Sequence, residues 1–458
     1  MPVAAQVLNQ ALRRPGRTAL RGAEGEVSYA DLARRVRAGA AHLAARGLAR
    51  GALVAISLPD SVDLLTAVLA ADLAGATPLV CDHAWDDEQR TRVTSGLRPD
   101  VVIDAPLPVG DVLLDAGDPG PGDLAWACFS SGSTGRPRAV VRTRASWTES
   151  FSHLSELAGI GPDDVVLVPG PLVSSLYGFA AVHALATGAT AEVPGRWSPA
   201  SLRDQVRRAT VVHLVPHCLP DLLDALRDEP GAPLRTAVVG GAALPAGARE
   251  RAAGLRIVSY YGATELSFVA ADPDGAGLRP FPGVDVQVRT APGQRLGEVW
   301  VRSPWQAEGY LGGAPGPLRT DADGWMTVGD VAEPYRPGEA LRLRGRGGGA
   351  IQTGGATVVP EDVEEVLRSV PGMSDIVVVG SPHPQLGSVV TAILEVGTAG
   401  PPPRSLLEAV ARAGLDKAQR PRRWYGVESL PRTPAGKPAR GLVAARLASG
   451  DPDIQRIT

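Results

Sequence analysis

The chain has 458 residues, too many for one ordinary domain, so we expect two or three. Hydrophobic residues make up 44% and charged residues 21%, as in globular proteins with a sizeable core. A formal net charge of −3 gives no basic surface for nucleic acid or anionic membranes. The start lacks a signal-peptide pattern, no apolar stretch has the pattern of a membrane span, and the three cysteines are scattered. We therefore expect a cytoplasmic protein without disulfides.

Helix and strand signals alternate along the first two-thirds of the chain. Ser28 is the expected N-cap of a helix, with Asp31 three residues on and apolar residues at helical spacing up to Leu43. Residues 62–73 also have the pattern of a helix. Short apolar strands are expected at 52–58, 165–168, 211–215, 237–239 and 257–260. Such strands, separated by helices, predict parallel sheets covered on both faces.

The pattern changes in the last third of the chain. Shorter alternating strands between 283 and 302 predict a small antiparallel or barrel-like unit. The glycine-rich stretch 344–349 is the best linker candidate. Beyond it we expect helices at 361–367 and 406–413 and strands at 376–379, 389–394 and 424–427. The expected fold is α/β, with a large N-terminal domain of stacked, mostly parallel sheets (1–345) and a small mobile C-terminal α+β domain (346–458).

The strongest local motif is FSSGSTGRPR at 129–138, directly after an apolar strand. Glycines permit a tight loop with inward-pointing N–H groups, hydroxyls add donors, and Arg138 adds charge, which together suit phosphate oxygens. A flexible surface loop is an equally good interpretation of this segment alone. A Walker-type loop fits poorly, because no Gly-Lys-Ser/Thr follows.

Two further motifs carry carboxylates next to turns. YYGATE at 260–265 follows a strand, and its position suits nucleotide binding in the crevice of an open sheet, with Glu265 as a hard oxygen ligand for Mg²⁺. GWMTVGD at 324–330 ends in Asp330, which could accept hydrogen bonds from ribose hydroxyls. Each motif, taken alone, is also compatible with an ordinary turn.

Lysine is scarce in this chain. Among 46 basic residues only Lys417 and Lys437 are lysines, which indicates a general pressure toward arginine. Lys437 lies in LPRTPAGKPAR at 430–440. A lysine is a compact, mobile point charge that arginine does not always replace. We therefore expect a specific role for Lys437 and give less weight to a solvated surface lysine.

In order and spacing these segments resemble the acyl-adenylate-forming superfamily of acyl- and aryl-CoA synthetases, peptide-synthetase adenylation domains and luciferases. The resemblance runs almost end to end. It includes SYADL, the apolar segment 54–80, LRTAVVGGAAL, GEVWVRS with GYL, and VVPEDVEEVL. It implies activation of a carboxylic acid with ATP and Mg²⁺ to an acyl-AMP, with release of pyrophosphate, and then transfer to a thiol, most simply that of coenzyme A.

The resemblance also implies roles for individual residues. Lys437 would reach the α-phosphate and the substrate carboxylate, Thr264 would bond the α-phosphate, and Glu265 would hold Mg²⁺. Tyr261 would stack on adenine, and Asp330 would hold the ribose. The residues implied to bind the nucleotide are Ser130, Ser131, Gly132, Ser133, Thr134, Gly135, Gly240, Gly241, Ala242, Tyr261, Gly262, Asp330 and Arg346. Arg138 joins Lys437, Glu265 and Thr264 in the implied catalytic set.

Several positions depart from the pattern of the superfamily. Arg138 stands where a lysine is usual, and we interpret it as a functional substitute. Arg144 stands where a histidine is usual, and Ser174 or Ser175 replaces the histidine of the acyl-pocket segment. Val328 replaces a threonine, and Gly348 replaces the hinge aspartate. These departures leave open a nucleotide-binding homologue with weak activity.

The substrate and the acceptor stay open at this level. Residues 172–179 contain no acid to pair with an α-ammonium, which disfavours an amino acid. The candidate lining of the acyl pocket is Ser174, Ser175, Tyr177, Phe179, His217 and Gly241, and it suits an aryl or short-to-medium acyl acid. The acceptor is coenzyme A, a phosphopantetheinyl carrier protein or an amine. His213 and His217 have the spacing of metal ligands, but ordinary packing fits them better.

Overall fold

The computed structural model describes residues 3–114, 120–130, 138–245, 247–252, 254–291, 294–346, 349, 351–353, 356–397, 400–433 and 436–458. The phosphate-loop residues Ser131, Gly132, Ser133, Thr134 and Gly135, and the hinge position Gly348, lie outside these ranges. The chain divides into two compact units. The first comprises Met1–Ser130, Pro137–Asp285 and Val301–Met326, and the second comprises Ser131–Arg136, Val286–Trp300 and Thr327–Thr458.

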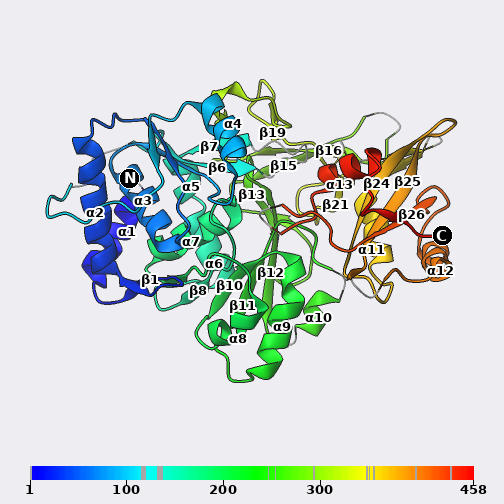
Figure 1. The fold of residues 1–458 in the computed structure, drawn as a ribbon, viewed down its shortest axis with the longest axis horizontal. Helices are drawn as coiled ribbons and strands as arrows, with labels where there is room; N and C mark the ends of the chain where they lie inside the picture. Colours follow the sequence, from blue (N-terminus) through cyan, green and yellow to red (C-terminus); the bar gives the residue numbers. More distant parts are fainter. Residues whose placement is uncertain are drawn as a thin grey trace. The chain divides into compact units, whose positions relative to one another are not determined.

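The first unit contains a large, mostly parallel sheet (Figure 1). Its strands run in the order β14-β13-β12-β11-β10-β8-β9-β1-β2, with antiparallel pairing at both edges. Their bounds are β1 Thr18–Arg21, β2 Glu26–Ser28, β8 Val165–Leu167, β9 Thr190–Glu192, β10 Val211–Leu214, β11 Thr236–Val239, β12 Arg256–Ala263, β13 Ser267–Asp272 and β14 Arg279–Pro280. The strands expected at 165–168, 211–215, 237–239 and 257–260 are thereby confirmed.

A second sheet of the first unit has the order β17-β7-β6-β4-β3-β5. Strands β6, β4, β3 and β5 are parallel, whereas β7 and β17 extend the edge in antiparallel fashion. The bounds are β3 Leu53–Ile56, β4 Thr77–Val80, β5 Val101–Ile103, β6 Leu124–Ser130, β7 Arg138–Thr143 and β17 Gly309–Tyr310. The expected architecture of stacked, mostly parallel sheets is confirmed for this unit.

Helices cover these sheets and separate them. Helix α7 contacts β6 of one sheet and β8 and β10 of the other, so it packs between the two. On the opposite face of the larger sheet, α8 and α9 bury the alternate side chains of β10 and β11 (Figure 1). Helix bounds are α1 Val3–Arg13, α2 Tyr29–Ala45, α3 Ser61–Leu73, α4 Asp87–Leu97, α5 Arg144–Thr148, α6 Phe151–Ala158, α7 Ser175–Thr187, α8 Pro199–Val206, α9 Leu219–Asp228 and α10 Ala248–Arg251, with 3₁₀ turns η1 Pro216–Cys218 and η2 Leu311–Gly313.

Local signals in the sequence explain where several helices begin. The Ser28 side chain accepts a hydrogen bond from the Asp31 N–H (3.1 Å), as its expected N-cap role requires. Asp60 caps α3 in the same way through the N–H groups of Val62 and Asp63 (both 2.9 Å). No helix in the described ranges is both long and apolar enough to cross a bilayer.

Short antiparallel strands follow, as the alternating pattern predicts. Strand β16 pairs with β20 and β20 with β21, while the end of β16 pairs with β19 at Val301 and Met326. The bounds are β15 Asp285–Arg289, β16 Gly297–Arg302, β18 Arg319–Thr320, β19 Met326–Thr327, β20 Asp330–Ala332 and β21 Leu343–Arg346. The first residues of the expected linker, Arg344 to Arg346, are therefore paired strand: ladder hydrogen bonds with β20 outweigh their glycine-rich composition.

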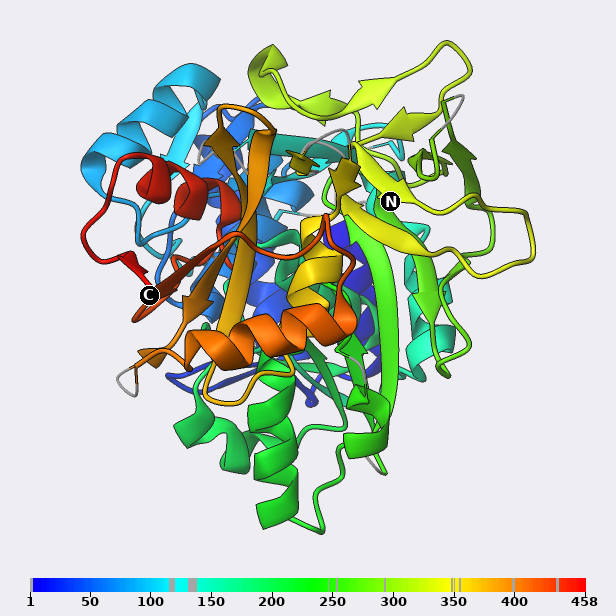
Figure 2. The same ribbon diagram turned by 90° about the vertical axis from the view of Figure 1, so that its right-hand side faces the viewer.

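The C-terminal part of the second unit is one sheet with helices on both faces (Figure 2). Along β24, Ile376 and Val378 belong to the core under α11 and α12, whereas Val377 and Val379 pack with Val443 of α13. This alternation is the two-residue period of a buried strand. Bounds are β22 Ile351–Thr353, β23 Ala356–Val358, α11 Pro360–Leu367, β24 Asp375–His383, β25 Gly387–Glu395, α12 Arg404–Gly414, β26 Arg423–Val427, α13 Arg440–Ala448 and β27 Gln455–Arg456. The α+β pattern expected here is confirmed.

Candidate active site

The YYGATE segment forms the end of β12 and the turn into β13. A Cβ atom built on Gly262 would overlap the carbonyl oxygen of Ser267, so only glycine fits here. The β12–β13 register shifts between Tyr261 and Gly262, and Ser267 adopts a positive φ of 59°. An irregularity of this kind re-aims the side chains beside it. This irregularity precedes Thr264 and Glu265, which form the turn at the end of β12.

The turn meets the beginning of helix α7. Ser175, the first residue of α7, and Thr264 share a hydrogen bond of 2.9 Å between their hydroxyl oxygens. Ser174 is the N-cap residue of the helix and is half-buried, as are Ser175 and Thr264. The structure therefore brings the predicted acyl-pocket segment and the predicted α-phosphate ligand together, although they are 89 residues apart.

Glu265 is held in place by a residue to which the sequence assigned no role. Its side chain is only 5% exposed, and Tyr310 Oη donates a 2.9 Å hydrogen bond to Glu265 Oε1. The ring of Tyr310 lies so close to Gly316 that a Cβ there would overlap it. Burial raises the pKa of Tyr310, and the Glu265 carboxylate raises it further, so the phenol remains a donor at neutral pH. Tyr310 belongs to the GYL segment and is the last residue of β17; the GYL segment is the signal that could have drawn attention to it.

Arg138 lies close to the same phenol. Its positive charge lowers the pKa of Tyr310, partly opposing the effects of burial and Glu265, and its Nε donates to the Pro315 carbonyl (2.7 Å). Arg138 opens β7 opposite Ser130, the last residue of β6. The hairpin therefore places the ends of the predicted phosphate loop beside Tyr310. The roles of that loop's five central residues stay predictions.

The Gly240–Ala242 segment directly follows strand β11. The Gly240 N–H donates to the Leu214 carbonyl (3.1 Å), so the backbone still follows the sheet at this point. Gly241 has a positive φ of 91°, which glycine tolerates, and Ala242 is exposed. Tyr261 is buried on the neighbouring strand β12. These residues border the carboxyl ends of parallel strands, where open α/β sheets bind ligands.

The predicted acyl-pocket residues have unequal environments. Phe179 is buried in an aromatic core, with ring centroids 5.7 Å from Trp147 and 5.0 Å from Phe268. Tyr177 is 3% exposed, and its ring lies on Gly170. His217 is exposed, beside the thiol of Cys218 at 3.4 Å.

The two histidines with ligand-like spacing do not share an environment. His213 is buried in β10, and burial lowers its pKa to about 3, so it is neutral at physiological pH. His217, by contrast, is exposed. Among the described residues, no group of three or more His, Cys, Asp or Glu side chains could hold a metal ion. These findings fit ordinary packing at this position.

The remaining predicted residues lie in the second unit. Asp330 and Arg346 are register partners across β20 and β21, and Asp330 is buried. Lys437 lies between β26 and α13, and its carbonyl accepts from the Thr433 N–H (2.7 Å). Arg432 anchors this loop through ion pairs with Asp375 on β24 (3.0 Å) and Glu395 on β25.

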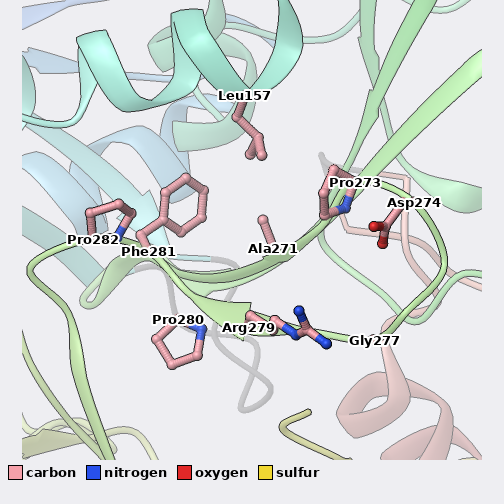
Figure 3. Close-up of a pocket in the computed structure, with 9 residues that line it drawn as sticks. All are labelled: Leu157, Ala271, Pro273, Asp274, Gly277, Arg279, Pro280, Phe281 and Pro282. Carbon is pink, nitrogen blue, oxygen red and sulfur yellow. The ribbon is translucent and has the colours of Figure 1, made fainter. Parts of the chain in front are cut away.

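A separate pocket of about 200 Å³ lies beside β13 and β14 (Figure 3). The side chains of Leu157, Ala271 and Phe281 line its apolar part, and Asp274 and Arg279 lie at one side. The full lining is Leu157, Ala271, Pro273, Asp274, Gly277, Arg279, Pro280, Phe281 and Pro282. It contains none of the predicted site residues, so it is not a candidate for the reaction.

Known proteins match both parts of the chain. The family model described as AMP-binding enzyme matches residues 7–311, and that of the AMP-binding enzyme C-terminal domain matches 362–437. An uncharacterized acyl-CoA ligase of Bacillus subtilis, YhfT, is 32% identical over 94% of this chain and 95% of its own length. A feruloyl-CoA synthase of Amycolatopsis is 28% identical over 96% of this chain and 98% of its own. ATP-bound MatB of Rhodopseudomonas palustris has a similar fold, with a TM-score of 0.86 at 23% identity, covering 98% of this chain and 99% of its own.

Proposed function

The chain belongs to the AMP-binding enzyme family, and we propose that it activates an aryl or short-to-medium acyl acid for transfer to coenzyme A. It is an AMP-forming ligase of the acyl-CoA synthetase type. The observation that carries the proposal is a cluster at the end of β12, in which one hydrogen bond joins Ser175 to Thr264 and another joins Tyr310 to Glu265. Hydroxyls next to a positioned carboxylate at this edge of a parallel sheet suit a nucleotide and its cation.

The charges in the reaction explain the proposed roles of these residues. The substrate carboxylate and the α-phosphate of ATP are both anionic, so bringing them together requires positive charge and hydrogen-bond donors. Thr264 would donate to the α-phosphate, and Lys437 would neutralise charge on the attacking carboxylate and the α-phosphate. Arg138, with the loop Ser130 to Gly135, would bind the departing pyrophosphate. No covalent enzyme intermediate is needed.

Glu265 is the residue that fits a magnesium ion. It is a buried carboxylate held by Tyr310, and carboxylate oxygens are the protein ligands that Mg²⁺ prefers. A bound Mg²⁺ would offset the charge of the phosphate oxygens. Gly240, Gly241 and Ala242 would lie along the adenine and the acyl pocket. Tyr261 and Gly262 would border the adenine, and Asp330, with Arg346 nearby, would hold the ribose.

Two catalytic steps by one enzyme favour a moving domain. We propose that residues 346–458 move relative to 1–345, so that Lys437 serves adenylation and then withdraws for thiol transfer. Gly348 would permit such a rotation, because glycine has wide backbone freedom. The ion pairs of Arg432 would keep the Lys437 loop rigid while its domain moves.

The direct test is ATP–pyrophosphate exchange across a panel of aryl and aliphatic acids. We expect acid-dependent exchange in the wild type and a loss of about 100- to 1,000-fold in Lys437→Ala, as when one transition-state donor is removed. Lys417→Ala is the matched control, because Lys417 is exposed and is the only other lysine. Equal exchange in Lys437→Ala would refute the role of Lys437. No exchange with any acid would favour a nucleotide-binding homologue.

The acceptor requires a separate measurement. Wild-type enzyme with an acid that supports exchange is given coenzyme A, a phosphopantetheinyl carrier protein or a simple amine. We expect acyl-CoA to form fastest. Turnover with the carrier or the amine, but none with coenzyme A, would refute the proposed acceptor while leaving adenylation intact.

A further inference from the structure

Two tyrosine rings cover the strand ends that border the proposed acyl site. Tyr260, on β12, lies over Gly240 so closely that a Cβ atom on that glycine would overlap its phenol. Tyr177, on α7, lies over Gly170 in the same manner, just beyond β8. Because β10 lies between β8 and β11 in the sheet, the two rings cover the strand ends on both sides of β10. Each ring occupies the space that a glycine leaves open.

The two phenols interact electrostatically. Burial raises the pKa of Tyr177, and its interactions with Cys218 and Tyr260 raise that pKa further. Burial also raises the pKa of Tyr260. Both hydroxyls are therefore protonated and uncharged at physiological pH. A phenol at this place offers one donor and an aromatic face, and it carries no charge to attract a second carboxylate.

Packed aromatic rings lie behind the two tyrosines. The Tyr260 ring centroid is 4.7 Å from that of Phe268, which is 5.0 Å from that of Phe179. Phe179 in turn stacks on Trp147 at 5.7 Å. Close-packed interiors yield little to an incoming group, because displacing a buried ring costs packing energy. The packed rings behind Tyr260 therefore leave its own ring little room to move aside.

We propose that Tyr260 is the specificity-determining residue of the acyl site, and that with Tyr177 it limits the substrate to a small aliphatic acid. This inference rests on the proposed function and narrows it, because it excludes aryl acids as good substrates. A pocket that is too short discriminates by steric overlap, and even one methylene group is worth about 10- to 200-fold in kcat/KM. Wild-type enzyme will favour acetate or propionate over hexanoate and benzoate by at least about tenfold.

The test compares Tyr260→Ala with Tyr260→Phe, using propionate, hexanoate and benzoate in pyrophosphate exchange. Tyr260→Ala will shift the kcat/KM ratio of benzoate to propionate upward by about tenfold or more, because the space above Gly240 opens. Tyr260→Phe keeps the ring and will keep the wild-type preference. If Tyr260→Ala fails to fold, Tyr260→Leu replaces it in the test and will raise the same kcat/KM ratio by a smaller factor. Thermal unfolding of each variant reports whether it is folded.

A second pair of variants tests whether the ring and the glycine share this space. Gly240→Ala will lower exchange with every acid, because the new methyl group displaces the Tyr260 ring. In the Tyr260→Ala background the same substitution will cost much less, which is the coupling expected of residues in contact. Equal losses in both backgrounds would overturn the inference.

The outcomes separate this inference from the function on which it rests. Exchange with a wild-type preference for benzoate, or with a preference that Tyr260→Ala leaves unchanged, would overturn the inference and leave adenylation standing. No exchange with any acid in any folded variant would overturn the proposed function and the inference with it. A uniform loss of rate in Tyr260→Ala, with unchanged preference, would indicate a structural role only.

Discussion

The two ends of strand β7 carry arginines in very different environments. Arg138, the first residue of the strand, is half-buried and lies beside Tyr310, which holds Glu265. Arg144, directly after the strand, is fully buried; its Nε donates to the Asp72 carboxylate (3.0 Å), and its Nη2 donates to the backbone carbonyls of Asp72 and Ala76. Both arginines stand where the superfamily usually has another basic residue. The comparison indicates that one substitution preserves charge at the site, whereas the other belongs to an internal ion pair.

The buried end should matter most for stability. Arg144→Met leaves the Asp72 carboxylate in the core without its cation, and removing one partner of a buried pair costs about 3–5 kcal/mol. Asp72 would keep only the Ala4 N–H (2.8 Å) as a described donor. We expect a corresponding fall in the free energy of unfolding, measured by urea denaturation.

Two controls sharpen this prediction. Arg203→Met removes one partner of an exposed ion pair with Asp228 in the same unit and should barely change the unfolding midpoint. The double variant Asp72→Leu/Arg144→Met removes both charges and should recover much of the loss, because the desolvation cost disappears with them. If Arg144→Met and Arg203→Met are equally mild, Arg144 is not a structural residue.

Much of the fold could be predicted from local pattern alone. The Ser28 cap, the buried helix before β4 and the alternation along β24 each follow from hydrogen bonding or periodicity over a few residues. Strand order depends on contacts between distant segments, so no local pattern contains it. The glycine-rich stretch that begins at Arg344 shows where local pattern fails. Its composition is typical of a linker, but its first residues form a strand because they pair with β20.

The candidate site was also predictable only in part, because local motifs identify some of its residues but not their distant partners. Motif spacing nominated Thr264 and Glu265, and the structure places them next to each other at the strand end. The partners that fix them, Ser175 and Tyr310, come from 89 and 45 residues away. Tyr260 is the first residue of the YYGATE motif but received no role of its own, because the packing of its ring on Gly240 is visible only in the structure.

At the other end of β7, we expect substitution to affect activity and leave stability nearly unchanged. Arg138→Gln removes the positive charge proposed to bind pyrophosphate oxygens and should lower kcat/KM for ATP by about 10- to 100-fold. Arg138→Lys restores the residue that the superfamily usually has and should stay within about threefold of wild type. Steady-state kinetics and thermal unfolding measure the two properties separately. A large fall in stability with Arg138→Gln would remove the contrast with Arg144.

The smallest expected effect concerns Tyr310, through which Arg138 and Glu265 are linked. Tyr310→Phe keeps the ring against Gly316 and removes the hydrogen bond to Glu265, together with a longer one (3.4 Å) that the phenol accepts from the Leu318 N–H. One such bond is worth about 1 kcal/mol, so the rate of pyrophosphate exchange at limiting Mg²⁺ should fall about fivefold.

Magnesium dependence decides whether Tyr310 acts through Glu265. If the phenol positions the carboxylate for the cation, Tyr310→Phe will raise the Mg²⁺ concentration needed for half-maximal exchange, and excess Mg²⁺ will restore most of the rate. A merely structural role would lower the rate equally at all Mg²⁺ concentrations. Tyr425→Phe is the matched control, because it removes a phenol hydroxyl from a ring that packs on the α13 side of the C-terminal sheet. An unchanged Mg²⁺ requirement in Tyr310→Phe would mean that burial alone fixes Glu265. The functional role of the Arg138 end of β7 would then depend on Arg138 itself and not on its link to Glu265.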